Sequence, residues 1–91
     1  MLFIRDIYLS PEQEEHVWTK HHVTPDEVNE VCYGTPVDRG GKDGTVQVYG
    51  QTGSGRYLFV ILVPIGEGDY EIVTARNMDT AERRYYRARM R

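Results

Sequence analysis

The last sixteen residues carry the groups best suited to holding phosphate. Six of the nine arginines lie in residues 76–91, within the stretch ARNMDTAERRYYRARMR that ends the chain. A guanidinium suits phosphate because its planar donors bind two oxygens at once. Arg83, Arg87 and Arg91 also recur every four residues, which is equally typical of a solvated helix face. A phosphate-binding surface and a solvated face are therefore the two interpretations of this segment.

The charge of the chain is divided unevenly. Residues 1–75 hold twelve acids and five bases, a balance of −7, whereas residues 76–91 hold two acids and six arginines, a balance of +4. An asymmetry of this size indicates an interaction at the basic end. Nucleic acid and an acidic protein surface are the two natural partners.

The elements that must position this segment can be read from periodicity and capping residues. An apolar strand is expected over residues 2–9, followed by a helix from Pro11 to about His21 with Ser10 as its N-cap. Thr24 and Glu27 form a capping box that begins a second helix, which should bury Val28, Val31 and Cys32 and end at Gly34. Residues 34–44 are a glycine-rich loop with room for a short edge strand around Val37.

In the second half of the chain, residues 45–49 alternate apolar and polar side chains, and a continuous apolar run follows over residues 57–63. These patterns predict a three-stranded antiparallel meander over residues 45–49, 56–63 and 70–76, with glycine turns between the strands. Asp79 and Glu82 form another capping box, which begins a final helix that runs to about Met90. The order β-α-α-β-β-β-α predicts an α+β fold in which helices pack on an antiparallel sheet. Ninety-one residues predict a single domain, 1–91.

Several classes of protein are not expected. The longest apolar run, residues 57–63, is too short to span a bilayer, and the N-terminus does not resemble a signal peptide, so a cytoplasmic protein with no membrane association is expected. Cys32 is alone, which excludes an internal disulfide. The spacing of His16, His21 and His22 does not align imidazoles on one helical face, so neither a metal nor another cofactor is expected.

Several short motifs together resemble the BrnT family of bacterial toxins. The first is Lys20-His21 with Val23 and Glu27-Val28, and the second is the hairpin from Gly50 to Arg56. The third runs from Ile72 to Arg76 and continues with Glu82-Arg83-Arg84 and Tyr86. The resemblance covers residues 16–88 and implies a RelE-like fold, a ribonuclease activity and a cognate DNA-binding antitoxin, expected to be of the ribbon-helix-helix type. This chain departs from the family pattern in its first helix, in His22 where a glycine is usual, and in its acidic net charge.

Metal-free RNA cleavage needs a base for the 2′-hydroxyl, cations that hold the scissile phosphate and a proton source for the 5′-oxygen. His21 is the candidate base, since its usual pKa of about 6.5 lies near neutrality and Lys20 beside it should lower that value. We predict that catalysis depends on His21, Arg76, Glu82 and Tyr86. We predict that RNA is bound by Lys20, Arg56, Arg83 and Arg87.

Other interpretations of these residues stay open. Glu82 is equally well explained as the acid of a capping box. Trp18 is expected in the core, with a base-stacking platform as the alternative, and Tyr85 is expected to pack on the sheet while Tyr86 is more exposed. At the level of function, the alternative to a nuclease is a non-catalytic module that docks an acidic partner through its basic C-terminal helix.

Overall fold

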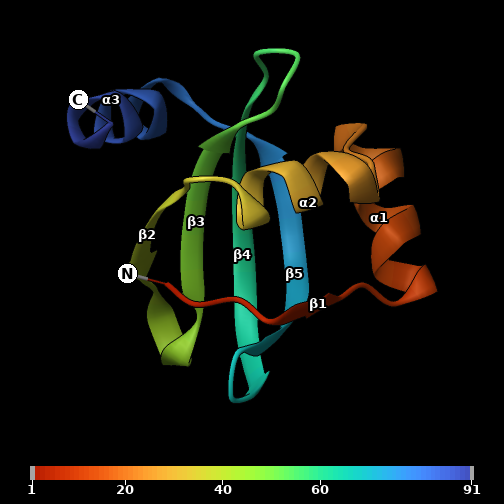
Figure 1. Ribbon diagram of the computed structural model, residues 1–91. Coiled ribbons are helices and arrows are strands. Elements are labelled where there is room, and N and C mark those ends of the chain that lie inside the picture. Colours follow the sequence, from red (N-terminus) through yellow and green to blue (C-terminus); the bar gives the residue numbers. More distant parts are fainter. Residues whose placement is uncertain (1, 91) are drawn as a thin grey trace.

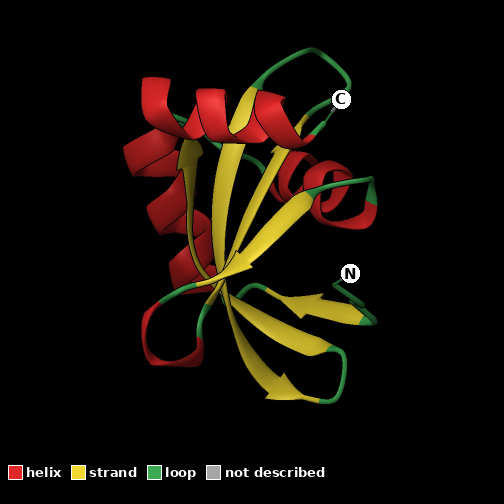
Figure 2. Cartoon of the chain, turned by 90° about the vertical axis from the view of Figure 1, so that its left-hand side faces the viewer, coloured by secondary structure: helices red, strands yellow, loops and turns green. Residues whose placement is uncertain are grey.

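A five-stranded sheet in the order β1-β5-β4-β3-β2 forms the centre of the structure, a computed structural model that describes residues 2–90. Helices lie on both sides of this twisted sheet (Figures 1 and 2). The part of the arginine pattern that falls on Arg91 lies outside the described residues. The strands are β1 (Asp6–Tyr8), β2 (Val37–Gly40), β3 (Val46–Gln51), β4 (Tyr57–Gly66) and β5 (Asp69–Asn77), and the helices are α1 (Pro11–His21), α2 (Pro25–Tyr33) and α3 (Thr80–Arg89), with a 3₁₀ turn at Lys42–Gly44.

The predicted α+β fold is confirmed, and one feature of the sheet differs from the expectation. The first strand is shorter than residues 2–9 and pairs parallel to β5, with Ile7 opposite Tyr70, so the sheet is mixed. The short edge strand anticipated around Val37 is present as β2, which pairs antiparallel to β3 and extends the meander to four strands. Both β1 and β2 lie at the sheet edges, where pairing depends on the path of the chain.

The two faces of the sheet bury separate apolar clusters. One face packs under α1 and α2, whose buried residues meet alternate residues of β3, β4 and β5. The approach of α2 is close, since a Cβ on Gly50 of β3 would lie 2.7 Å from a methyl group of Val31. The opposite face packs under α3 through a smaller aromatic cluster made by Tyr49, Phe59, Met78 and Tyr86.

Side-chain hydrogen bonds fix the starts of the helices, as the capping residues predicted. Both capping boxes are present, one between Thr24 and Glu27 and the other between Asp79 and Glu82. The Ser10 side chain accepts a hydrogen bond from the backbone N–H of Gln13 at the start of α1. Because α3 begins directly after β5, its cap fixes how the basic helix leaves the sheet.

Two predictions about aromatic residues were wrong. Trp18 was expected in the core, but its side chain is 53% exposed, because Val17 is the one residue that α1 buries. Tyr86 was expected to be more exposed than Tyr85, but it is buried in the aromatic cluster under α3 while Tyr85 is half-buried. The predicted burial of Cys32 is confirmed. Among residues 2–90, no helix has the length and apolar composition to cross a bilayer.

Candidate functional site

Arg76 and Glu82 join the end of β5 to the start of α3. The guanidinium donates two hydrogen bonds to the carboxylate, Nη1 to Oε1 and Nη2 to Oε2, each of 2.8 Å. It also donates to the Asn77 carbonyl and lies 4.5 Å from the centre of the Phe59 ring. Glu82 accepts the backbone N–H of Asp79 at 2.9 Å, so it caps the helix and orients Arg76 at the same time. The interpretation of Glu82 as the acid of a capping box is confirmed, and its catalytic role stays a prediction.

Arg76 is held in one orientation and still has N–H groups that can donate to a ligand. Three of its five N–H groups bond to protein acceptors within residues 2–90, which leaves two for a ligand. Its side chain is 35% exposed, whereas that of Glu82 is 16% exposed. The neighbouring carboxylate keeps the pKa of Arg76 above its ordinary value. The result is a permanently charged donor held in one direction at the molecular surface.

Arg83 and Arg87 stack on Tyr57, which stands at the start of β4. Their guanidinium carbons lie 4.4 and 5.4 Å from the centre of the ring. Arg87 donates a hydrogen bond of 3.4 Å to the phenol oxygen, and this contact lowers the pKa of Tyr57, with a smaller effect from Arg83. The phenol therefore ionises more readily than an ordinary tyrosine and sits beside two cations.

The side of α3 that carries these arginines is hollowed and cationic. A hollow of about 340 Å³ is lined by Thr80, Arg83, Arg84 and Arg87. Within the part of the chain that the structure describes, none of these three arginines has a carboxylate within 4 Å. Cations that lack internal partners are available to an external anion. This hollow is the surface of the molecule best suited to phosphate.

His21 lies half-buried at the C-terminal end of α1. Burial lowers the pKa of its imidazole, and the positive charges of His16, Arg76 and Lys20 lower it further. Lys20 acts on this pKa in the predicted direction, but burial is the largest of the four causes and Lys20 the smallest. Since Arg76 acts on the imidazole, the two groups are within electrostatic reach of each other. A neutral imidazole at neutral pH is able to accept a proton.

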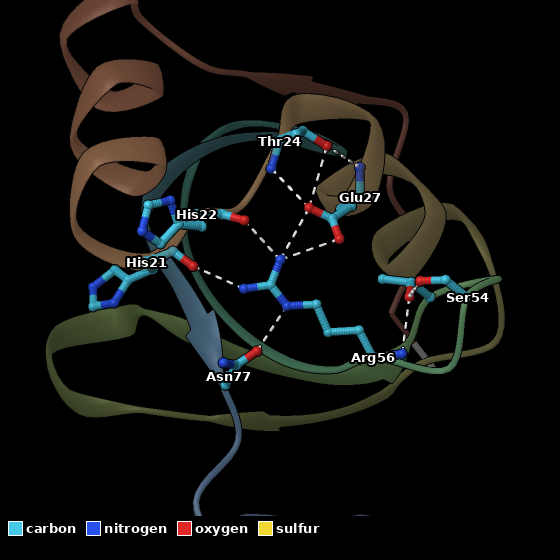
Figure 3. Close-up of polar contacts among 8 residues, drawn as sticks. His21, His22, Thr24, Glu27, Ser54, Arg56 and Asn77 are labelled. Carbon is cyan, nitrogen blue, oxygen red and sulfur yellow. Dashed lines mark hydrogen bonds and ion pairs between the residues drawn. The ribbon is translucent and has the colours of Figure 1, made fainter.

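Arg56 faces the protein interior between α1 and α2 (Figure 3). Its guanidinium donates to both carboxylate oxygens of Glu27 at 3.1 Å and to the carbonyls of His21 and His22 at 2.7 Å each. Its Nε donates to the Asn77 side chain at 2.8 Å. These bonds tie the end of α1 to the end of β5. The geometry therefore favours a positioning role for Arg56 over the RNA contact that its sequence suggested.

The remaining predicted residues divide between the surface and the core. Lys20 is exposed one residue before His21. Tyr86 is buried, its ring meets that of Tyr57 edge-on at 6.0 Å, and burial raises the pKa of its hydroxyl. A buried phenol with a raised pKa is poorly placed to touch a substrate. Within residues 2–90, no cluster of three or more His, Cys, Asp or Glu side chains is arranged to hold a metal.

Sequence reasoning missed Tyr57 as a member of the site. The signal was present, because residues 57 and 59 of one strand share a face, and the register places Phe59 opposite Arg76. It also missed a second stack, in which Arg39 of β2 and Arg89 of α3 lie 4.5 and 3.7 Å from the Tyr85 ring. The spacing of Tyr85 and Arg89 on α3 is a local signal, but Arg39 comes from a distant strand, so no local pattern would have indicated its part in the stack.

Comparison with known proteins supports the fold. No protein-family model matches the sequence, and no curated protein matches it significantly. Among solved structures, the chain is similar to the 1.1 Å crystal structure of the Brucella abortus ribonuclease toxin BrnT, with a TM-score of 0.69. The match covers 82% of this chain and 97% of that one, at 13% sequence identity. The chain therefore has a BrnT-like fold, as its motifs implied.

Proposed function

We propose that this chain is a metal-independent endoribonuclease, the toxin of a toxin–antitoxin pair or a descendant of one. The observation that carries the proposal is that Arg56 bonds both to the His21 carbonyl at the end of α1 and to Asn77, the residue after Arg76, while Glu82 orients Arg76. Burial lowers the pKa of His21, and the positive charges of His16 and Arg76 lower it further. The BrnT-like fold supports the same activity. The protein would act in the cytoplasm, where its RNA substrate is found.

The chemistry is an internal displacement at phosphorus. His21 accepts the proton of the 2′-hydroxyl as the 2′-oxygen forms a bond to phosphorus and the bond from phosphorus to the 5′-oxygen breaks. Arg76 holds the phosphate oxygens as negative charge grows on them, and Arg83 and Arg87 bind the neighbouring phosphates. The products are a 2′,3′-cyclic phosphate and a free 5′-hydroxyl.

The departing 5′-oxygen needs a proton, and Tyr57 is better suited to give it than Tyr86. The pKa of Tyr57 is lowered by Arg87 and Arg83, whereas the pKa of Tyr86 is raised by burial. An acid whose pKa is closer to neutrality transfers its proton more readily. We therefore replace the predicted role of Tyr86 with one for Tyr57.

Cleavage of RNA in the presence of EDTA tests this proposal. The wild-type protein should produce fragments ending in a 2′,3′-cyclic phosphate, and Arg76→Ala should slow the reaction about 10²- to 10³-fold, as expected for loss of a donor to the transition state. Arg5→Ala is the matched control, because Arg5 pairs with Asp69 at the start of β5, whereas α3 follows the end of that strand. An Arg76→Ala protein as active as the wild type would remove the case for catalysis.

The alternative is a non-catalytic module that docks an acidic partner through α3, which would use the same arginines. The half-buried imidazole of His21, whose pKa is lowered by burial and by nearby positive charges, favours catalysis, since docking an acidic surface does not need a base. A toxin should slow growth when expressed, and a cognate antitoxin, which we expect to be of the ribbon-helix-helix type, should relieve that effect. Harmless accumulation of the protein would favour the module.

A further inference from the structure

We propose that Trp18, together with His22, forms a subsite that binds a nucleobase of single-stranded RNA next to the cleavage site. This inference rests on the proposed ribonuclease function and adds the part of the substrate that the arginines do not contact. Arginine side chains hold phosphates, which every nucleotide shares. A stacking platform would hold one base and set where along the RNA the scissile phosphate lies.

Trp18 is unusually exposed to solvent for the largest aromatic side chain in the protein. It is the one tryptophan of the sequence and is 53% exposed, although an indole of this size is ordinarily mostly buried. Its ring meets that of His22 edge-on, with centroids 5.2 Å apart and planes at 89°. The contact braces the indole at the surface. A braced, exposed aromatic face is what an unstacked base needs.

The indole lies beside the proposed base of the reaction. Trp18 and His21 are three residues apart on α1, so their side chains leave the helix about 60° from each other. Figure 3 shows the imidazoles of His21 and His22 next to each other at the end of α1, both pointing away from Arg56. A strand of RNA whose scissile phosphate lies at His21 would therefore have an adjacent base close to Trp18.

The hollow next to the indole suits a base better than a phosphate. It has a volume of about 280 Å³ and is lined by Glu14, Trp18, Val23, Thr24 and Pro25. The Glu14 carboxylate repels a phosphate, while a neutral base is not repelled and gains apolar contact with Pro25. The phosphates would consequently remain on the cationic side, with Lys20, His21 and Arg76.

The backbone at His22 provides a separate indication. His22 ends α1 in the left-handed conformation, with φ of 53° and ψ of 42°, where glycine is the least strained residue. A side chain kept at such a position points to a role for that side chain. Here the His22 imidazole packs against Trp18, and the backbone carbonyl of His22 accepts a hydrogen bond from Arg56.

Because the protein has one tryptophan, its fluorescence reports on this subsite alone. A fluorescein-labelled heptanucleotide with 2′-O-methyl groups cannot be cleaved, so anisotropy of the label measures RNA binding while indole emission measures stacking. We expect RNA to quench the indole. An abasic nucleotide at one position of the oligomer should abolish the quenching and leave most of the binding.

Variants separate the subsite from RNA binding as a whole. Trp18→Ala should weaken affinity about tenfold, a size typical of one base stacked on an aromatic side chain. Tyr33→Ala, which removes another half-exposed aromatic at the end of α2, should leave affinity unchanged. Binding seen by anisotropy with no change in the wild-type indole emission would overturn the subsite and leave the nuclease standing. Absence of RNA binding by the wild type would overturn both proposals.

Discussion

Arg56 and the pair Arg83 and Arg87 are the same residue type in opposite situations. Arg56 donates to a carboxylate, two carbonyls and an amide, and its side chain is 24% exposed. Arg83 and Arg87 stack on Tyr57 and have no carboxylate partner within residues 2–90. The difference shows that the acceptors around an arginine decide its role: one whose N–H groups bond to protein acceptors is structural, and one without such acceptors can bind a ligand. Arg56 holds the end of α1 in place, whereas Arg83 and Arg87 are exposed.

The largest expected effect on stability comes from Arg56→Ala. It leaves the Glu27 carboxylate, two carbonyls and the Asn77 amide without their donor, which should lower the free energy of unfolding by about 2–3 kcal/mol. Arg83→Ala, the matched control at an exposed site, should change it by less than about 0.5 kcal/mol. Urea denaturation measures both. If both substitutions change the free energy of unfolding equally, Arg56 is no more structural than Arg83.

The next largest effect concerns the two tyrosines under α3. Tyr57→Phe removes the hydroxyl that we assign as proton donor and should slow cleavage about 10²-fold, the usual contribution of a general acid. Tyr86→Phe removes a buried hydroxyl and should leave the cleavage rate nearly unchanged. Single-turnover rates with saturating protein separate this chemical step from binding. If the Tyr86 variant is the slower of the two, the original assignment of Tyr86 is the correct one.

A smaller effect is expected on RNA affinity from Arg83→Ala and Arg87→Ala. Each substitution removes one phosphate contact, so each should weaken binding by roughly tenfold or less at moderate salt. Each should also reduce the slope of log affinity against log salt by about 0.7. Arg5→Ala should change neither quantity. An unaltered salt slope in both variants would place the RNA elsewhere.

The sequence predicted those parts of the fold whose signals are local. Both capping boxes depend on residues three apart, and the placement of Glu82 and Tyr86 on one side of α3 follows from a spacing of four. The motifs that resemble BrnT gave the fold and brought His21, Arg76 and Glu82 under consideration together. The structure adds that Glu82 binds Arg76 directly.

The failures came from contacts that no local pattern contains. Arg56 meets Glu27 across 29 positions, so its inward direction could not be read from its place after a glycine turn. Trp18 was assigned to the core because tryptophan is usually buried, but Val17 is the one residue of α1 that is buried. The parallel pairing of β1 with β5 likewise joins segments from near the two ends of the sequence.

The central claim is that the end of α1 and the cationic surface of α3 act as one site. NMR titration of the His21 imidazole, without RNA and with the non-cleavable oligomer, tests it most directly. The free protein should show a pKa below the usual 6.5 or so, because of burial and the nearby positive charges. Bound RNA should raise that pKa, since a phosphate stabilises the protonated ring. A His21 titration that saturating RNA leaves unchanged would contradict the claim.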